Sequence, residues 1–239
     1  MFNKKVFAAE LIGTFALVLV GPGLAASGAG PLQTALGFAF VVVAFAYAYG
    51  SISGTHLNPA VTFGQALHGT VTWGEALVYW IAQFLGAILA AWFLMVVVFG
   101  NSAANGLGAT HLASGLTTLD GVVIEALLTF FLVSTILHTA KSNFGGVAAG
   151  FALAFCVLFG FGLTGASLNP ARSFGPALFT NGLANPNFWL LYFVGPLVGA
   201  ALAAFSARSF SSAEMMSAPM TEAAPASKPA SKKTAPRRK

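Results

Sequence analysis

Six uninterrupted apolar stretches dominate this chain of 239 residues. Each is long enough to cross a hydrocarbon layer of ~30 Å as an α-helix of about 20 residues. Only 7% of the residues are charged, whereas a soluble domain carries roughly a quarter. The stretches are continuous, unlike the alternating segments of a membrane β-barrel. We therefore expect an all-α membrane protein with spans at about 6–26, 33–52, 76–99, 121–139, 146–164 and 187–207.

The net charge of +5 comes from cations that six spans would place on one side of the membrane. This one-sided distribution indicates membrane topology rather than nucleic-acid binding, and it predicts cytoplasmic termini. Arg172 is the single exception among the eleven Lys and Arg residues. The other ten are Lys4, Lys5, Lys141, Arg208, Lys228, Lys232, Lys233, Arg237, Arg238 and Lys239.

A fourteen-residue phrase occurs twice between the apolar stretches. Residues 54–67 read GTHLNPAVTFGQAL and residues 165–178 read GASLNPARSFGPAL, identical at nine of fourteen positions. Further matches pair Glu10 with Glu125 and Gly86 with Gly199, so halves at about 5–100 and 120–207 align. Each half has three spans, an odd number, and the halves must therefore have opposite orientations. An inverted repeat places its functional site near the middle of the membrane, where the halves meet.

The Asn-Pro-Ala segments within the phrases are too short to span. Ten residues from Asn58 to Leu67 make a helix of about 15 Å, half the hydrocarbon thickness. We expect two re-entrant half-helices that enter from opposite faces and meet in the middle. Asn suits the N-cap and Pro the first helical position. The motif residues are Asn58, Pro59, Ala60, Asn169, Pro170 and Ala171.

Two such caps would place amide donors beside the positive ends of two helices. With its oxygen held by its own helix, each Asn would leave its NH2 group free to point outward. A water oxygen or a solute hydroxyl could accept from these donors, whereas a cation would be repelled. The arrangement therefore predicts a path for uncharged, hydrogen-bonding molecules. The loops before the caps should line it, with Gly54, Thr55, His56, Gly165 and Ser167 on its wall.

These phrases, their spacing and the paired Glu-xxx-Thr-Phe segments resemble those of the aquaporin, or major intrinsic protein, family over residues 5–207. The resemblance implies a passive channel with one pore per subunit, a homotetramer and no cofactor. Its substrates would be water and small uncharged solutes. Residues 1–208 would form the channel in a cell (inner or plasma) membrane, in contact with the lipid bilayer, followed by a disordered basic cytoplasmic tail at 209–239.

The resemblance also implies a narrow selectivity constriction around Arg172. Counting from the motifs, its other members are Phe38, Val157 and Ala166. Water-selective members generally have His where this chain has Val157, and glycerol facilitators usually add a second aromatic residue to Phe38. Val157 and Ala166 look more like the nodulin-type channels, which pass small neutral solutes such as glycerol-like polyols or metalloid acids.

Glu10 and Glu125 support an alternative hypothesis, because carboxylates within a membrane often mark proton relays. The alternative is a proton- or ion-coupled transporter of small solutes. The family resemblance instead makes both residues structural buttresses of the embedded loops. An enzyme or a metal site is not indicated, since the chain has a single cysteine, Cys156, and no nucleophile–base pair or metal-ligand cluster.

Overall fold

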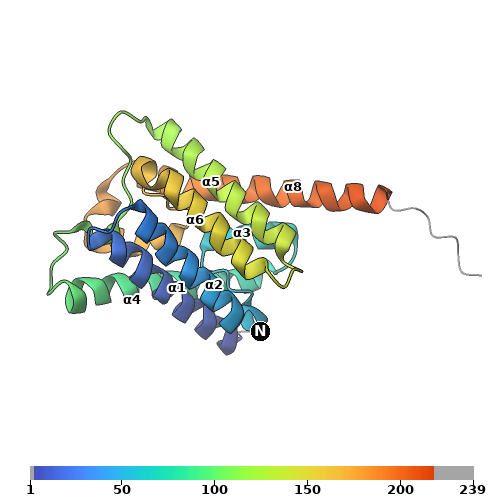
Figure 1. Ribbon diagram of the computed structural model, residues 1–239, viewed down its shortest axis with the longest axis horizontal. Coiled ribbons are helices and arrows are strands. Elements are labelled where there is room, and N and C mark those ends of the chain that lie inside the picture. Colours follow the sequence, from blue (N-terminus) through green and yellow to red (C-terminus); the bar gives the residue numbers. More distant parts are fainter. Residues whose placement is uncertain (1–2, 218–239) are drawn as a thin grey trace, which may run out of the picture.

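The computed structural model describes residues 3–217, with side chains as far as Phe210, and this part of the chain is helical (Figure 1). The six long helices are α1 (Lys4–Ala26), α2 (Pro31–Ser53), α4 (Trp73–Phe93), α5 (Thr118–Thr139), α6 (Gly145–Thr164) and α8 (Gly195–Ser217). Two helices of ten residues, α3 (Pro59–His68) and α7 (Pro170–Phe179), lie between them. Two π-helical segments extend the third and sixth spans, namely η1 (Leu94–Val98) after α4 and η4 (Leu190–Val194) before α8, and two short 3-10 helices, η2 (Gly106–Gly108) and η3 (Gly182–Ala184), lie in the loops.

Six helices in the described part are long and apolar enough to cross a membrane, which confirms the predicted all-α fold with six spans. The observed third and fourth spans begin three residues before the predicted starts at 76 and 121. The reason is a capping box at each start, in which Thr72 pairs with Glu75 and Thr117 pairs with Asp120. Such polar first turns satisfy the free N–H groups of the helix and belong to it, although they interrupt the apolar pattern.

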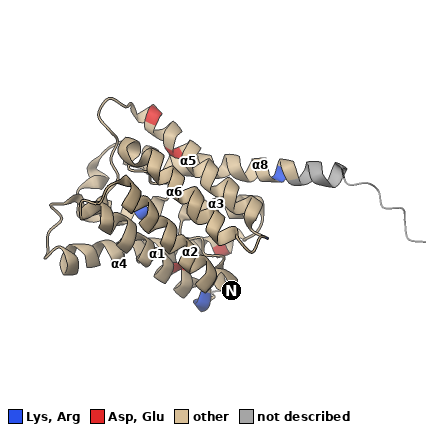
Figure 2. Cartoon of the chain, viewed as in Figure 1, with Lys and Arg blue, Asp and Glu red and all other residues tan. Residues whose placement is uncertain are grey.

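Charged residues are sparse along the bundle (Figure 2). Large apolar side chains face outward instead, including Phe40, Leu77, Phe151 and Leu202, each at least half exposed. A water-soluble domain rarely exposes apolar patches of this extent. The outer surface of the bundle therefore suits a lipid environment.

Each half of the repeat is held together by one close helix crossing. Helix α1 packs on α4 in the first half, and α5 packs on α8 in the second. A Cβ atom at Gly86 would lie 2.4 Å from the Leu11 carbonyl oxygen, and one at Gly199 would lie 2.1 Å from that of Ala126. Only glycine permits the backbones to approach so closely. The matched glycines thus produce the same crossing in both halves.

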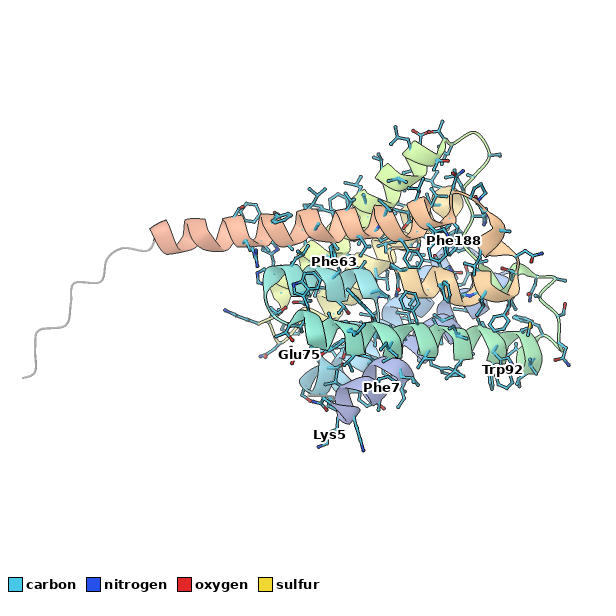
Figure 3. All side chains as sticks on the ribbon, turned by 180° about the vertical axis from the view of Figure 1, so that it is seen from behind. Lys5, Phe7, Phe63, Glu75, Trp92 and Phe188 are labelled. Carbon is cyan, nitrogen blue, oxygen red and sulfur yellow. The ribbon has the colours of Figure 1, made fainter. Side chains whose placement is uncertain are left out.

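The two halves interlock through their short helices. Helix α3 packs mainly on α8 of the opposite half, and α7 packs mainly on α4, while α2 and α6 join the halves directly. Figure 3 shows α3 and α7 nearly end to end, between α4 and α8. Two helices of ten residues, each about 15 Å long, together replace one span. This is the predicted pair of half-helices in an inverted repeat.

Helix α8 is longer than the sequence indicated. It continues to Ser217, so residues 209–217, expected as the start of a disordered tail, are helical. The physical reason is local, because this segment, SFSSAEMMS, contains no Gly or Pro and the first helix breaker is Pro219. The remainder of the predicted tail, residues 218–239, lies outside the described residues.

Candidate functional site

The two half-helices begin at the paired asparagines, as expected. The side-chain oxygen of Asn58 accepts from the N–H of Ala60 at 2.8 Å. That of Asn169 accepts from Ala171 at 3.0 Å and from Arg172 at 3.2 Å. A proline follows each asparagine at the first helical position, where its missing N–H costs nothing. Both N-caps predicted from the sequence are confirmed.

The asparagine NH2 groups are not entirely free, which corrects the expectation from the sequence. Asn58 Nδ2 donates to the Leu168 carbonyl at 2.8 Å, and Asn169 Nδ2 donates to the Leu57 carbonyl at 2.8 Å. Each amide therefore uses one N–H to join the opposite loop and keeps one further N–H. This reciprocal pair fixes the starts of the two half-helices against each other.

The loops before the asparagines have an unusual backbone at equivalent positions in both halves. Thr55 and Leu57 have φ of 53° and 51°, and Ala166 and Leu168 have φ of 44° and 53°. Residues other than glycine in this left-handed region cost of order 1–3 kcal/mol each when the conformation is strained. The conformation therefore requires support from the surrounding structure.

One buried carboxylate in each half provides that support. Glu10 accepts from the backbone N–H groups of His56 at 2.9 Å and Leu57 at 2.7 Å. Glu125 accepts from those of Ser167 and Leu168, both at 2.8 Å. Both glutamates are completely buried. Their remaining contacts are with side chains that donate to them, namely Ser53, Gln83 and Thr164.

Polar side chains at the start of each half-helix repeat the same arrangement with different residues. His56 Nδ1 lies 3.0 Å from Thr62 Oγ1 in the first half. In the second, Ser167 Oγ lies 2.6 Å from Ser173 Oγ. The His56 ring also packs against the Tyr79 ring, with centroids 4.6 Å apart and the planes tilted by 32°. Each contact ties a loop to the first turns of the helix that follows it.

A cavity of about 330 Å³ runs along the junction of the two halves. Most of the predicted site residues line it, including Phe38 of α2, Val157 of α6 and both asparagines. We call it the inner cavity, because it extends toward the α5–α6 connection at Ala140 and Asn143. The predicted residues on its wall are Phe38, Gly54, Thr55, His56, Asn58, Val157, Ala166, Ser167, Asn169 and Arg172.

A second cavity of about 610 Å³, the outer cavity, lies on the other side of Arg172. Arg172 is the residue that the linings of the two cavities share. Gly165 lines the outer cavity rather than the inner one, because the loop turns there before Ala166 faces inward. The Pro and Ala residues of both motifs are buried at the helix starts and are not among the lining residues of either cavity.

Arg172 is held at this boundary with little freedom to move. It is only 2% exposed, and its Nη1 donates to the Gly108 carbonyl at 2.7 Å. Its guanidinium carbon lies 5.5 Å from the centre of the Phe38 ring. Its Nε is buried without a partner among the described residues. A guanidinium buried with an unused donor can bind a polar molecule that passes between the cavities.

Several residues that support the site were missed in the sequence. Gly108 anchors Arg172 from a loop, and the hydroxyl of Thr110 in that loop donates to Ser173 at 2.9 Å. Tyr79 and Tyr192 donate to the carbonyls of Ser53 and Thr164 at the ends of α2 and α6. The tyrosines occupy matching places in the repeat, so that pattern was available as a signal. The loop contacts have no such signal, because their partners are far apart in sequence.

Comparison with known proteins gives concordant matches. The sequence model of the family described as "Major intrinsic protein" matches residues 1–206. A glycerol uptake facilitator protein-like 6 from Lactiplantibacillus plantarum is 39% identical, with 85% of this chain and 97% of the relative covered. An aquaporin Z from Brucella melitensis is 40% identical, with 85% and 96% covered. An aquaporin TIP2-3 from Zea mays is 38% identical, with 84% and 85% covered.

The fold is similar to that of a solved structure. The X-ray structure of the aquaglyceroporin from Plasmodium falciparum superposes with a TM-score of 0.76. The match covers 89% of this chain and 98% of the other, at 23% sequence identity. The six long helices and two half-helices thus form an architecture already seen in a solved channel structure.

Proposed function

Because this chain belongs to the major intrinsic protein family, we propose that it is a passive membrane channel for water and small uncharged solutes. The pore would consist of the inner and outer cavities, joined past Arg172. The observation that carries this proposal is the position of Arg172 between two cavities, one of which is also lined by both N-cap asparagines.

The chemistry of the pore wall favours neutral permeants. The two asparagines each retain one amide N–H, and the positive ends of α3 and α7 lie behind them. These groups donate hydrogen bonds to a water oxygen or a hydroxyl. A cation would lose hydration and meet Arg172 together with two positive helix ends. Ions and protons are therefore excluded, while neutral molecules exchange hydrogen bonds along the wall.

We further propose that Phe38, Val157, Ala166 and Arg172 form the selectivity constriction. Val157 and Ala166 are small and apolar, so they leave more room than a ring at either position would. Relatives at similar identity are named as a glycerol uptake facilitator-like protein and as an aquaporin. Both names are compatible with a pore that passes water together with glycerol-like polyols or metalloid acids.

The coupled-transporter hypothesis lacks support in the site and in the comparisons. Glu10 and Glu125 are completely buried, and neither is among the residues that line the inner or outer cavity. Their oxygens accept hydrogen bonds from the loops rather than facing a permeant. We propose that both act as structural buttresses. Because the chain belongs to a family of channels, it is a transport protein and not an enzyme.

The assembly and membrane of this integral membrane protein are also proposals. The apolar outer surface suits a homotetramer in a cell (inner or plasma) membrane, with one pore per subunit. Cytoplasmic termini follow from the one-sided cations. In support, Lys5 lies at the end of the bundle toward which α8 extends (Figure 3).

Stopped-flow measurements on proteoliposomes test the proposed function. Water efflux driven by an impermeant osmolyte should have a low activation energy, and glycerol should enter at a measurable rate. Neither rate should change when a pH gradient is imposed. Empty liposomes provide the baseline. Solute uptake that depends on the pH gradient would contradict a passive channel and revive the coupled transporter.

A further inference from the structure

The Gly21–Pro22 step of α1 lies against the boundary between the two cavities. Both residues are buried, and Pro22 stands inside the helix. Neither residue is among those that line the inner or outer cavity. They nevertheless contact both groups that face each other at this boundary, the Phe38 ring and the loop that holds Arg172.

Gly21 makes room for the aromatic ring of Phe38. A Cβ atom at residue 21 would lie 2.1, 2.2 and 2.5 Å from three carbons of that ring. Real Cβ atoms essentially never approach closer than 3.0 Å. The ring therefore rests directly on the α1 backbone, and any side chain at residue 21 must displace it. The ring also lines the inner cavity and lies 5.5 Å from the guanidinium carbon of Arg172.

Pro22 supports the loop that anchors the guanidinium. A Cβ atom at Gly108 would lie 2.2 Å from the Pro22 carbonyl oxygen and 2.6 Å from its Cα, so the two backbones are in contact. Gly106, Leu107 and Gly108 have φ of 73°, 49° and 67°, a run of three left-handed residues. This backbone aims the Gly108 carbonyl at Arg172 Nη1, 2.7 Å away. Leu107, which is strained in this conformation, is completely buried.

These contacts form a chain that begins and ends on α1 and includes both groups at the boundary between the cavities. Gly21 touches Phe38, Phe38 faces Arg172, Arg172 donates to Gly108, and Gly108 rests on Pro22. We propose that Gly21 and Pro22 are positioning residues that set the separation of Phe38 and Arg172 and thereby the size of solute admitted. This inference rests on the proposed function, since it concerns the selectivity of the same pore.

The test is the Gly21→Ala variant. The added methyl group would push the Phe38 ring off α1 by roughly 1 Å, from 2.1 Å toward the 3.0 Å limit, and so into the cavity that the ring lines. The opening then narrows, and we expect glycerol flux to fall about tenfold relative to water flux, because the larger solute meets the added barrier first; a tenfold fall corresponds to about 1.4 kcal/mol of barrier. An equal fall in both fluxes, or no fall, would overturn the proposal.

Gly23→Ala is the matched control on the same helix. Gly23 is also buried, but a Cβ atom there would meet the tip of the Leu94 side chain at 3.1 Å, and that side chain can shift. The ratio of glycerol to water flux should match the wild type in this variant. A change in the ratio equal to that of Gly21→Ala would overturn the proposal, because it would show that any added methyl group on α1 alters selectivity, whether or not it touches Phe38.

The double variant Gly21→Ala/Phe38→Ala tests the contact itself. Without the ring, the added methyl group has nothing to displace, so the double variant should conduct like Phe38→Ala alone. If Gly21→Ala alone fails to fold, the double variant should restore folding, and its failure to do so would overturn the proposal. An effect of Gly21→Ala that persists unchanged without the ring would overturn it as well.

A measurement without transport separates this proposal from the proposed function. A double-mutant cycle is formed by the melting temperatures, in detergent, of the wild type, Gly21→Ala, Phe38→Ala and the double variant. A coupling between positions 21 and 38 supports the contact even if the wild-type protein conducts no glycerol. Independent, additive effects would contradict the contact even if the wild type conducts both solutes.

Discussion

Val157 and Cys156 are adjacent on α6 but have different surroundings. Both are buried, but Val157 is among the residues that line the inner cavity, whereas Cys156 is not and its thiol donates to the Leu128 carbonyl. The proposed constriction thus contains Val157 but not the neighbouring thiol. This difference makes the single cysteine of the chain a built-in control for the position of residue 157.

Mercury compounds should therefore leave wild-type water flux unchanged but inhibit the Val157→Cys variant. A thiol that faces the pore is accessible and binds mercury in the path of water, whereas a buried thiol does not react. Stopped-flow swelling with and without the mercurial measures the effect, and a reducing thiol should reverse it. Inhibition of the wild type, or an insensitive Val157→Cys variant, would contradict these positions.

Arg172 presents its charge where a permeant must pass in the proposed pore. A unit charge about 5 Å away contributes ~3 kcal/mol to the energy of a cation at an effective dielectric constant of ~20. Replacement by Val should therefore raise proton or alkali-cation leak at least tenfold, while water still passes. Fluorescent pH measurements on proteoliposomes report the leak. A leak equal to that of the wild type would remove Arg172 from its proposed role.

At the scale of elements, each half-helix depends on a loop that would not hold its shape alone. The loops contain left-handed residues other than glycine, and one buried carboxylate per loop accepts from two consecutive N–H groups. The half-helices can meet in the middle of the membrane only while these loops remain fixed. Non-helical backbone at that depth requires such internal partners.

The Glu125→Gln variant tests this dependence. The amide offers a donor where the carboxylate offered an acceptor, which leaves a buried N–H of the loop unpaired and costs about 1–3 kcal/mol. The melting temperature in detergent should fall clearly. Glu75→Gln is the control, because Glu75 also accepts from a backbone N–H but is exposed. Equal melting temperatures for Glu125→Gln and the wild type would contradict the buttress role.

The sequence predicted those features that depend on neighbours along the chain. Apolar length gave the spans, and Asn followed by Pro gave the two N-caps, because capping is decided within one turn. The hydrogen bond that the Asn58 side-chain NH2 group donates was missed, because its acceptor, the Leu168 carbonyl, is 110 residues away in the sequence. The Gly108 anchor of Arg172 was missed for the same reason.

Helix ends were the other limit of prediction, for a different physical reason. An apolar pattern detects the part of a helix that faces lipid, but α8 continues past it to Ser217 through a Ser-rich segment that contains no Gly or Pro to stop it. The end of α2 at Ser53 lies one residue from the predicted end at 52, because Gly54 adopts the left-handed C-cap conformation that stops the helix.

At the scale of the whole molecule, the apolar outer surface is shared between lipid and neighbouring subunits in the proposed tetramer. Native mass spectrometry of protein released from detergent should give four times the 24.5 kDa chain mass. The same species should elute as one peak in gel filtration at low protein concentration. A monomer that conducts water in proteoliposomes at full rate would contradict the assembly without affecting the pore.

The last 22 residues should be dispensable for orientation and transport. Among the described residues, those that line the two cavities lie between Leu17 and Tyr192. A chain that ends at Ser217 loses six of the eleven Lys and Arg residues, but it retains Lys4, Lys5, Lys141 and Arg208. These four still share one side of a six-span topology, so the cation bias that orients the chain persists.

Flux of water and glycerol per inserted protein should therefore equal that of the full chain, and protease accessibility should report the same orientation. An inverted orientation or a lost flux would place an essential function in residues 218–239.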